Sequence, residues 1–497
     1  MLLAALLSLA LLGTMEACKG RSSSSQTGIV CRITRPAVLV LNQETTKLIQ
    51  KAFQRATYPD IKGERVILFL GRVNYGLYNI QISNLSISSS QAELKKDKSI
   101  NIAIQNVSVI FKGTLQYEYN GGWLLAVHRS VDFKIDTSLD LQINTQLACD
   151  GGRVQADTSD CFLSFHKLHL SLHGEKQPGW IEQLFTDFIS FTLKLILKGQ
   201  VCKEISVLAN IMANFVQDKA ANFLTDGDIG VDISLTTSPI IKDSYLESHH
   251  KGFLTYKNQS SGFQDSSYTP NILGDSRMLY FWFSEKVLSS LAKAAFLDKR
   301  LMLTLTGNDF KALLENKGLD TTQDILQEIF QGSFRDSQVV VRSLAAPLIT
   351  CKPEGTIVKS SVGVEIQLLR PDQASTVTVF SFEEDVVTVI QASYEEKKLI
   401  LDLSDFQIQH KSSRSFSTLS TSQESVQDFL KTLTIMVGIP VIISWLEPAL
   451  TTLLNSKGLD LFDIINPEII TKEGYLVLQM DFGFPQHLLE DFLQTII

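Results

Sequence analysis

The stretch NIQISNLSIS at residues 79–88 decides the fold class, because apolar and polar side chains alternate along it. The same alternation recurs at residues 100–105, 107–109 and 131–136. A period of two is typical of a β-strand with one face buried and the other in water. We therefore predict long antiparallel strands across residues 66–172, arranged as a strongly twisted sheet or barrel.

Helical patterns flank these strands. A stripe of apolar residues with helical spacing predicts a helix over residues 35–58, and a second helical block over residues 178–224 that Gly199 breaks or kinks. Strand-like residues follow at 229–235 and 240–246. The chain thus combines helices and strands in the α+β class.

The order of elements then repeats. A Ser-, Asn- and Gly-rich stretch at residues 257–274 reads as a linker, and beyond it we expect a helix over 284–296, strands over 301–408, and a helix over 425–455 interrupted near Gly438, Pro440 and Pro448. The interval from Gly230 to Pro239 equals that from Gly458 to Pro467. These features indicate two copies of one module. We expect domains at 18–257 and 277–481, a linker at 258–276 and a terminal helix at 482–497.

The first 17 residues are an apolar run ending in Ala17, which predicts a secretory signal peptide. No later stretch has 18 uncharged apolar residues, so we predict no transmembrane helix. The net charge is −8, with 26 Lys and Arg against 22 Asp and Glu over residues 18–257 and 19 against 30 beyond. Nucleic-acid binding is excluded, because it needs clustered basic residues.

Motifs for catalysis and metal binding are missing from the sequence. It contains no GxSxG, GxxxxGK[ST], HExxH or CxxC pattern. Ser248, His249 and His250 invite a hydrolase hypothesis, but neighbouring residues in a strand face opposite ways, so we expect a polar patch at a pore wall or an ordinary strand end. Three acids in a row at residues 383–385 could bind calcium, although a solvated turn is the simpler interpretation. We predict no enzyme, no metal and no cofactor.

The last stretch, DFGFPQHLLEDFLQTII at residues 481–497, predicts an amphipathic helix. Its apolar stripe contains Leu488, Leu489, Phe492, Leu493 and Ile496, and Gly483 between Phe482 and Phe484 is a candidate hinge. Two interpretations stay open: a helix docked on the core, or a mobile cover at the mouth of an apolar cavity.

Several long motifs resemble the lipid-transfer and lipopolysaccharide-binding protein family. They are CRITRPAVLVLNQET (31–45), QISNLSI (81–87), IQNVSVIFKGTL (104–115), PGWIEQLFTDFISFTLKLILKGQVC (178–202), DGDIGVDISL (226–235), YLESHHKG (245–252), GDSRMLYFWFSEKV (274–287), FDIINPEII (462–470) and MDFGFPQHLLEDFLQ (480–494). The resemblance covers essentially the whole chain. It implies an elongated boomerang of two twisted barrels joined by a central sheet, with an apolar lipid tunnel.

The same resemblance implies site residues. The tunnel is expected to be lined by Gln217, Lys219, Ser248, His250, Phe281 and Phe462, with Lys219 in a position where the family pattern has Arg. A disulfide is implied between Cys161 and Cys202, leaving Cys18, Cys31, Cys149 and Cys351 unpaired. In a secreted protein, the sequons at Asn84, Asn106 and Asn258 are candidates for N-glycosylation. The terminal helix is implied to cover the N-terminal tunnel mouth.

The implied function is exchange of cholesteryl esters and triglycerides between plasma lipoproteins, without bond making or breaking. The cargo would be cholesteryl ester, triglyceride and phospholipid, the partners lipoprotein surfaces, and the protein a secreted monomer. Phospholipid transfer and lipopolysaccharide binding, which this family also contains, remain the alternatives. An N-terminal half with a net charge of only +4 gives little support to lipopolysaccharide binding.

Overall fold

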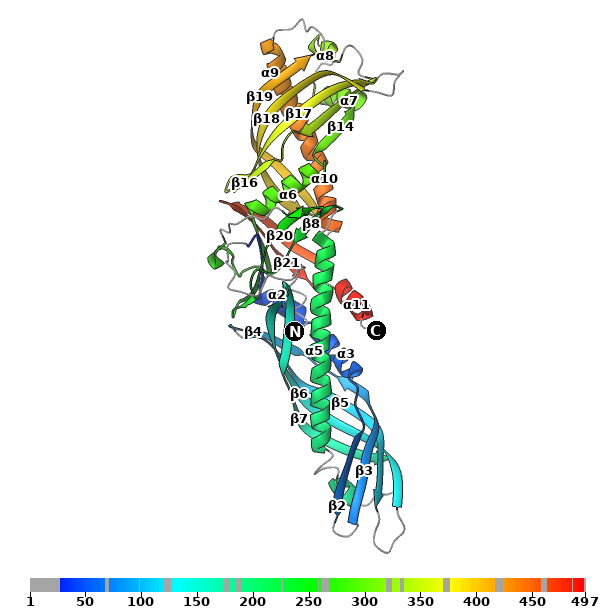
Figure 1. Ribbon diagram of the computed structural model, residues 1–497. Helices are drawn as coiled ribbons and strands as arrows, with labels where there is room; N and C mark the ends of the chain where they lie inside the picture. The colour runs from blue at the N-terminus through cyan, green and yellow to red at the C-terminus, as the bar shows by residue number, and fades with distance from the viewer. Residues whose placement is uncertain are drawn as a thin grey trace.

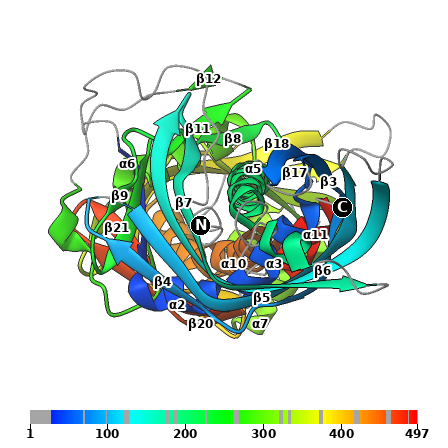
Figure 2. The same ribbon diagram turned by 90° about the horizontal axis from the view of Figure 1, so that it is seen from below.

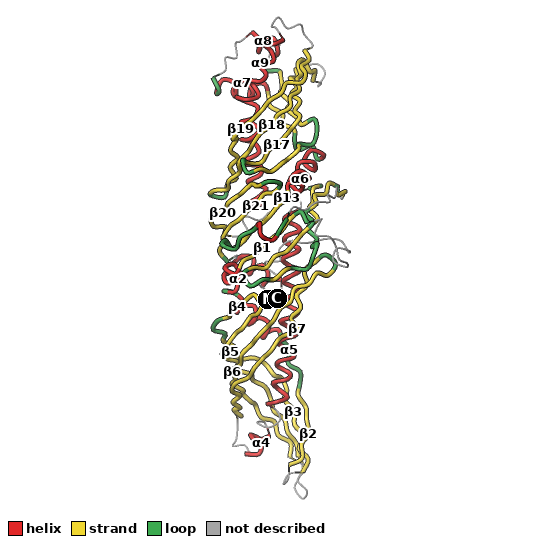
Figure 3. Tube along the Cα trace, turned by 90° about the vertical axis from the view of Figure 1, so that its left-hand side faces the viewer, coloured by secondary structure: helices red, strands yellow, loops and turns green. Residues whose placement is uncertain are grey.

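The protein is a long rod in which two similar modules meet at a central sheet (Figure 1). The computed structural model describes residues 27–67, 71–97, 99–119, 127–173, 179–184, 190–224, 227–257, 259–260, 268–318, 324–330, 335–369, 376–415, 423–456, 463–484 and 486–495. Along the rod the strands form successive groups, first in one module, then in the central sheet, then in the other module (Figure 3). The predicted α+β architecture of two twisted modules is confirmed.

In the N-module, strand β1 (Ile29–Thr34) is followed by two helices. They are α2 (Arg35–Asn42) and α3 (Thr45–Arg55), so the single helix predicted over residues 35–58 is divided in two. Pro36 lies in the first turn of α2, where its missing N–H costs nothing. The strands of the module are β2 (Ile61–Ile67), β3 (Gly71–Ser86), β4 (Ser90–Lys95), β5 (Ser99–Tyr119), β6 (Val127–Asp150) and β7 (Arg153–His173).

The alternating pattern predicted these strands correctly, and its irregularity within residues 79–88 has a structural cause. After Ile82 the apolar positions move from even to odd numbers, and the pairing of β3 with β5 shifts register between Ile82 and Asn84. An extra residue at a β-bulge reverses which face each following side chain meets. The strands are antiparallel in the order β2-β3-β5-β6-β7, and β4 pairs with the other part of β5.

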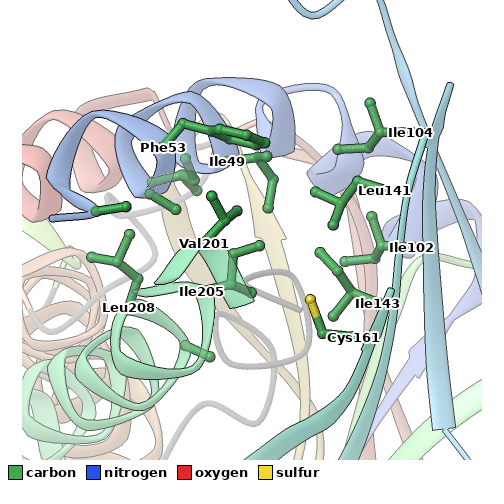
Figure 4. Close-up of a cluster of buried hydrophobic side chains, with 14 of the residues drawn as sticks. Ile49, Phe53, Ile102, Ile104, Leu141, Ile143, Cys161, Val201, Ile205 and Leu208 are labelled. Carbon is green, nitrogen blue, oxygen red and sulfur yellow. The ribbon is translucent and has the colours of Figure 1, made fainter. Parts of the chain in front are cut away.

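Helix α4 (Gly179–Leu184) and the long helix α5 (Ser190–Leu224) follow. The prediction that Gly199 breaks or kinks the helix is wrong, because α5 continues through it and a Cβ at this position would meet no neighbouring atom. Seen from below, the strands of the N-module curve around α5 (Figure 2). Val201, Ile205 and Leu208 of α5 point towards Ile49 and Phe53 of α3 and towards Ile102, Ile104, Leu141 and Ile143 of the sheet (Figure 4).

The C-module repeats this plan. It contains β13 (Leu279–Ser284), α6 (Glu285–Leu297), β14 (Met302–Thr306), α7 (Gly307–Asn316), α8 (Asp324–Ile329), β15 (Ser337–Ser343), β16 (Leu348–Lys352), β17 (Gly355–Leu369), β18 (Thr376–Glu395) and β19 (Lys398–Ser415). The strand order is β14-β15-β17-β18-β19, with β16 on β17, which matches the N-module strand for strand.

Two short helices inside the block predicted as strands were missed. Helix α7 is capped by Thr306, whose hydroxyl accepts from the Asp309 N–H. It buries Phe310 and Leu314 one turn apart, and α8 buries Leu326 and Ile329 three residues apart. The prediction that residues 383–385 form a solvated turn is also wrong, because these acids lie in the middle of β18.

The long C-module helix consists of three parts. They are α9 (Gln423–Leu433), a π-helical turn (Thr434–Gly438) and α10 (Ile439–Ser456), which contains Pro448. The predicted interruption near Gly438 is therefore a local widening of a continuous helix. Residues Glu424–Ser444 are long and apolar enough to cross a membrane by length and composition. In the structure Val426, Leu430, Leu433 and Val437 from this stretch pack into the C-module core, and 28% of the stretch is buried.

The central sheet joins the modules through strands from both. Its order is β20-β21-β13-β1-β10-β9, with β1 (Ile29–Thr34), β9 (Ile240–Ile241), β10 (Tyr245–His250), β20 (Asp463–Lys472) and β21 (Tyr475–Gly483). A smaller sheet contains β8 (Ile229–Asp232), β11 (Phe253–Tyr256) and β12 (Gln259–Ser260). Strands β1 and β13, which occupy equivalent places in their modules, pair antiparallel at the middle.

Candidate functional site

One face of the central sheet carries three of the predicted tunnel residues. Cys31 of β1 lies opposite Ser248 of β10 on one side and Phe281 of β13 on the other. Directly opposed residues in antiparallel strands share a face, and Cys31 and Phe281 both pack with the N-module core. We call this the inner face. His250 lies two residues beyond Ser248 and therefore shares it.

Ser248 and His250 form a buried polar pair on the inner face. They are 2% and 1% exposed as residues, and His250 Nε2 lies 2.7 Å from Ser248 Oγ. The sequence argument excluded a dyad of adjacent residues but overlooked this one, which has the spacing that places both groups on one face. Burial, and then the neighbouring His249, lower the pKa of His250 well below its usual value. The ring is therefore neutral at pH 7.

This pair lacks the remaining parts of a hydrolase. A catalytic histidine is oriented by a third group, but His250 Nδ1 has no hydrogen-bond partner among the described residues. The nearby thiol of Cys31 is no nucleophile either, because burial, and then Glu247, raise its pKa far above its usual value. What the structure shows is a buried, hydrogen-bonded polar pair on the inner face.

The outer face of the same sheet carries an ion pair that sequence reasoning missed. Arg32 Nε donates to Glu247 Oε2 at 2.7 Å, and both side chains are at most 3% exposed. Burial alone would raise the pKa of Glu247, but hydrogen bonds from His249 and Tyr268 and the charge of Arg32 outweigh it, so the pKa is lowered. Residues 32 and 247 are 215 positions apart, which no local pattern could connect.

Arg32 also holds part of the predicted linker. Its guanidinium donates to the carbonyl oxygens of Pro270 and Leu273, and the Tyr268 hydroxyl donates to Glu247. A short 3-10 helix, Pro270–Ile272, lies in this segment. The end of the linker is therefore packed on the central sheet.

The C-module contains a partly open apolar cavity of about 290 Å³. This volume is near the lower end of the usual range for ligand pockets, about 300–1,000 Å³. The wall is formed by strands β14, β15, β17 and β18 and by the helices that cover them. Its residues include Leu303, Phe310, Phe330, Val341, Ile366, Phe382, Val386, Phe429, Leu433, Val437 and Ile442.

The terminal helix α11 (Gln486–Thr495) lies beside α3 and α5 (Figure 1). Leu489 and Phe492 are 1% and 0% exposed, and Leu493 is half-buried against the N-module core. Phe482 is buried and Phe484 half-buried in the same cluster. Gln486, His487, Glu490 and Asp491 are exposed, so the predicted wet face is confirmed. Of the two interpretations left open, the structure has the helix docked.

Other predicted residues have mixed outcomes. Cys161 and Cys202 form a disulfide that joins β7 to α5, with their Cα atoms 5.9 Å apart. Cys31 and Cys351 are free and buried. The expectation that Cys149 is unpaired is wrong: it is disulfide-bonded, to a partner outside the described residues. The resemblance implied a single disulfide, between Cys161 and Cys202, so it gave no indication that Cys149 is bonded.

Asn84 and Asn106 are exposed, as an attached glycan requires. Gln217 and Lys219 lie near the end of α5, but the description does not extend to their side chains or to that of Leu488. The expected signal peptide, Cys18, Asn258, Phe462, Pro485 and Ile496 lie outside the described residues.

Two family models cover most of the chain. The N-terminal domain of the LBP / BPI / CETP family matches residues 37–212, and its C-terminal domain matches residues 224–482. The chain belongs to the LBP / BPI / CETP family. The two matched regions correspond to the two modules, and the boundary between them lies at the end of α5.

Two relatives that match over nearly the whole chain carry the same name. The chain is similar to the cholesteryl ester transfer protein of Homo sapiens, with 60% identity and complete coverage of both chains. Identity to the protein of the same name from Gallus gallus is 53%, over 98% of this chain and 97% of the relative. The phospholipid transfer protein of Homo sapiens is 23% identical over 70% of this chain and 69% of its own length.

A solved structure supports the fold. The crystal structure of lipopolysaccharide binding protein aligns with 92% of this chain and 99% of its own, with a TM-score of 0.52 and 18% identity. At this identity the likeness bears on the fold alone.

Proposed function

We propose that this protein is a secreted plasma carrier that exchanges cholesteryl esters and triglycerides between lipoprotein particles. The observation that carries the proposal is full-length identity of 53–60% to relatives named for cholesteryl ester transfer. The apolar cavity of the C-module supports it, since moving a neutral lipid through water is the problem that such a cavity solves. Exposing a lipid with dozens of apolar carbons costs roughly 20–30 kcal/mol, at about 0.8 kcal/mol per CH₂.

The proposed path runs from the C-module cavity along the inner face of the central sheet into the N-module. Ser248, His250 and Phe281 line it, and the family resemblance implies Gln217, Lys219 and Phe462 as further lining residues. Phospholipids close its openings, and α11 covers the N-module end. The protein acts as a monomer, carries glycans at exposed sequons, and needs no cofactor.

The proposal assigns no catalytic step to the protein. Ser248 and His250 lack an orienting third group within the described residues, and no group of three or more metal-binding side chains is found among those residues either. Phospholipid transfer is the second candidate. It has weaker support, because the relative of that name is only 23% identical over about two thirds of its length.

A transfer assay tests the proposal. Donor lipoproteins carry cholesteryl ester labelled in both the sterol and the acyl chain, and acceptor particles are isolated after incubation with the purified full-length protein. Both labels are expected to reach the acceptor in equal amounts, still joined as an ester. Separated labels would mean hydrolysis, and movement of phospholipid without ester would favour the second candidate.

A further inference from the structure

The cavity of the C-module has a single acidic side chain in its described wall. Strand β18 presents Phe382, Glu384 and Val386 to the cavity, and Glu384 is 2% exposed. Its neighbours face the other way: Glu383 is exposed, and Asp385 pairs with Lys411 at 2.7 Å outside. An acid in a row of apolar wall residues loses its hydration, so its position requires an explanation.

Only one of the two carboxyl oxygens of Glu384 has a hydrogen-bond partner among the described residues. The Thr434 hydroxyl donates to Oε2 at 2.7 Å, whereas Oε1 has no partner among the described residues. The ring of His410 on β19 is nearby, but its Nδ1 lies 3.8 Å from Oε1, beyond hydrogen-bond distance. Both ring nitrogens of His410 are also unpartnered within the described residues. Buried polar groups are nearly always hydrogen-bonded, so a group is expected to occupy this place.

Two irregularities of the backbone meet at the same point. The pairing of β18 with β19 shifts register between Glu383 and Glu384, and Thr434 begins the π-helical turn Thr434–Gly438. Thr434, Val437 and Gly438 of that turn line the cavity together with Glu384. Bulges in strands and π-helical turns both concentrate at functional sites, where they redirect a side chain. Here they place a carboxyl and the hydroxyl that orients it at one spot of an apolar wall.

Burial, which outweighs the hydrogen bond from Thr434 and the nearby ring of His410, raises the pKa of Glu384. A protonated carboxyl has one O–H to donate, and the Thr434 hydroxyl already occupies Oε2. Oε1 is therefore the oxygen left to carry the proton, in a residue that lines the cavity. Neutral lipids that fit an apolar cavity carry few polar atoms, and the ester carbonyl oxygen is the strongest acceptor among them.

We propose that Glu384 is an anchor for ester lipids: its Oε1–H donates a hydrogen bond to the ester carbonyl oxygen of a lipid bound in the C-module cavity. The inference rests on the proposed function, which supplies the ester-containing cargo. Thr434 is a positioning residue, because it fixes the carboxyl by binding Oε2. The anchor would favour an ester over an equally apolar lipid without a carbonyl.

A matched pair of ligands tests the anchor. Purified full-length protein is loaded from an emulsion that contains equal amounts of cholesteryl oleate and cholesteryl oleyl ether, which lacks the carbonyl, and the bound lipids are counted by mass spectrometry. One hydrogen bond corresponds to about a two- to tenfold preference for the ester. Glu384→Leu should remove the preference contributed by this site, and Glu384→Gln, which keeps an N–H donor, should retain part of it. Glu383→Leu, on the outward face of the same strand, is the control and should match the wild type.

Infrared spectroscopy of bound cholesteryl oleate labelled with ¹³C at the carbonyl provides the second measurement. A hydrogen-bonded carbonyl absorbs at lower frequency than a free one. The low-frequency component that belongs to Glu384 should vanish in Glu384→Leu and move in Glu384→Gln, so the latter variant suffices if the former does not fold.

The outcomes separate the anchor from the function. Equal ester-to-ether ratios in the wild type and Glu384→Leu, with an unchanged infrared band, would overturn the anchor and leave lipid transfer intact; Glu384 would then bind a water or His410 only. If neither lipid binds to any variant, the proposed function itself fails.

Discussion

The rings of Phe215 in α5 and Phe492 in α11 lie with their centroids 5.5 Å apart at an interplanar angle of 62°. This edge-to-face contact joins the long helix of the N-module to the terminal helix across 277 positions of sequence. Phe492 is fully buried, so α11 is held by packing at its apolar stripe. Because α11 is the last described element, its removal deletes no strand of either module.

Ending the chain after Phe484 should therefore leave a folded, secreted protein with impaired transfer of neutral lipid. Each buried side chain of α11 contributes about 1.5–3 kcal/mol, which affects the N-module opening more than the distant C-module. The test is ester transfer by the truncated protein, alongside its secretion level and thermal unfolding. Glu490→Gln on the wet face is the control, and normal transfer after truncation would contradict a role as a cover.

Removing the disulfide should destabilise the N-module. Cys161 and Cys202 are separated by 41 positions, and closing a loop of that length is worth about 4 kcal/mol in the chain-entropy model. The double variant Cys161→Ala and Cys202→Ala should lower the urea midpoint, with α5 losing hydrogen-exchange protection first. An unchanged midpoint would mean that packing of α5 on the sheet suffices.

Glu247→Gln should be strongly destabilising, because it leaves the buried Arg32 charge unpaired. Breaking one half of a buried ion pair costs about 3–5 kcal/mol. The same pair predicts a pH dependence: the pKa of Glu247 is lowered in the folded state, so its contribution is present above the unfolded pKa and is lost as the pH falls through the folded pKa. Urea unfolding from pH 7 to pH 3 should show a steeper loss for the wild type than for the variant.

Glu384 should show the opposite sign. Its pKa is raised, so the stability linked to its proton is fully present below the unfolded value of about 4.3 and declines as the pH rises through the folded pKa. Glu384→Gln, which cannot ionise, should therefore gain stability relative to the wild type between pH 4 and pH 8. A difference in unfolding free energy that stays constant over this range would show that the carboxyl is not perturbed. Thr434 and His410 face the same group and are unchanged in this comparison.

Much of the fold could be predicted because it depends on local patterns. Alternation located the long strands of the N-module, and the equal Gly-to-Pro intervals indicated the repeat that the two matching strand orders confirm. The amphipathic stripe of α11 correctly separated Leu489 and Phe492 from Glu490 and Asp491. What local patterns cannot provide is pairing over distance, as between Arg32 and Glu247, or the disulfide of Cys149.

The site was less predictable for a different reason. Glu383, Glu384 and Asp385 look alike in sequence as three solvated acids, and only their place in β18 shows that the middle one faces the cavity. The row Phe382-x-Glu384-x-Val386 contained the signal, since alternation puts all three on one face. The pair of Ser248 and His250 was overlooked for a similar reason. Only adjacent residues were compared, although residues two positions apart share one face of a strand.

The antiparallel pairing of β1 with β13 has the symmetry of a contact between two copies of one module. Each strand opens its module, each is followed by a helix, and each has the closing strands of its own module on its other side. The two halves of the central sheet are thus related by an approximate two-fold axis between Cys31 and Phe281. This is the arrangement of an isologous homodimer, in which one edge strand pairs with its own copy.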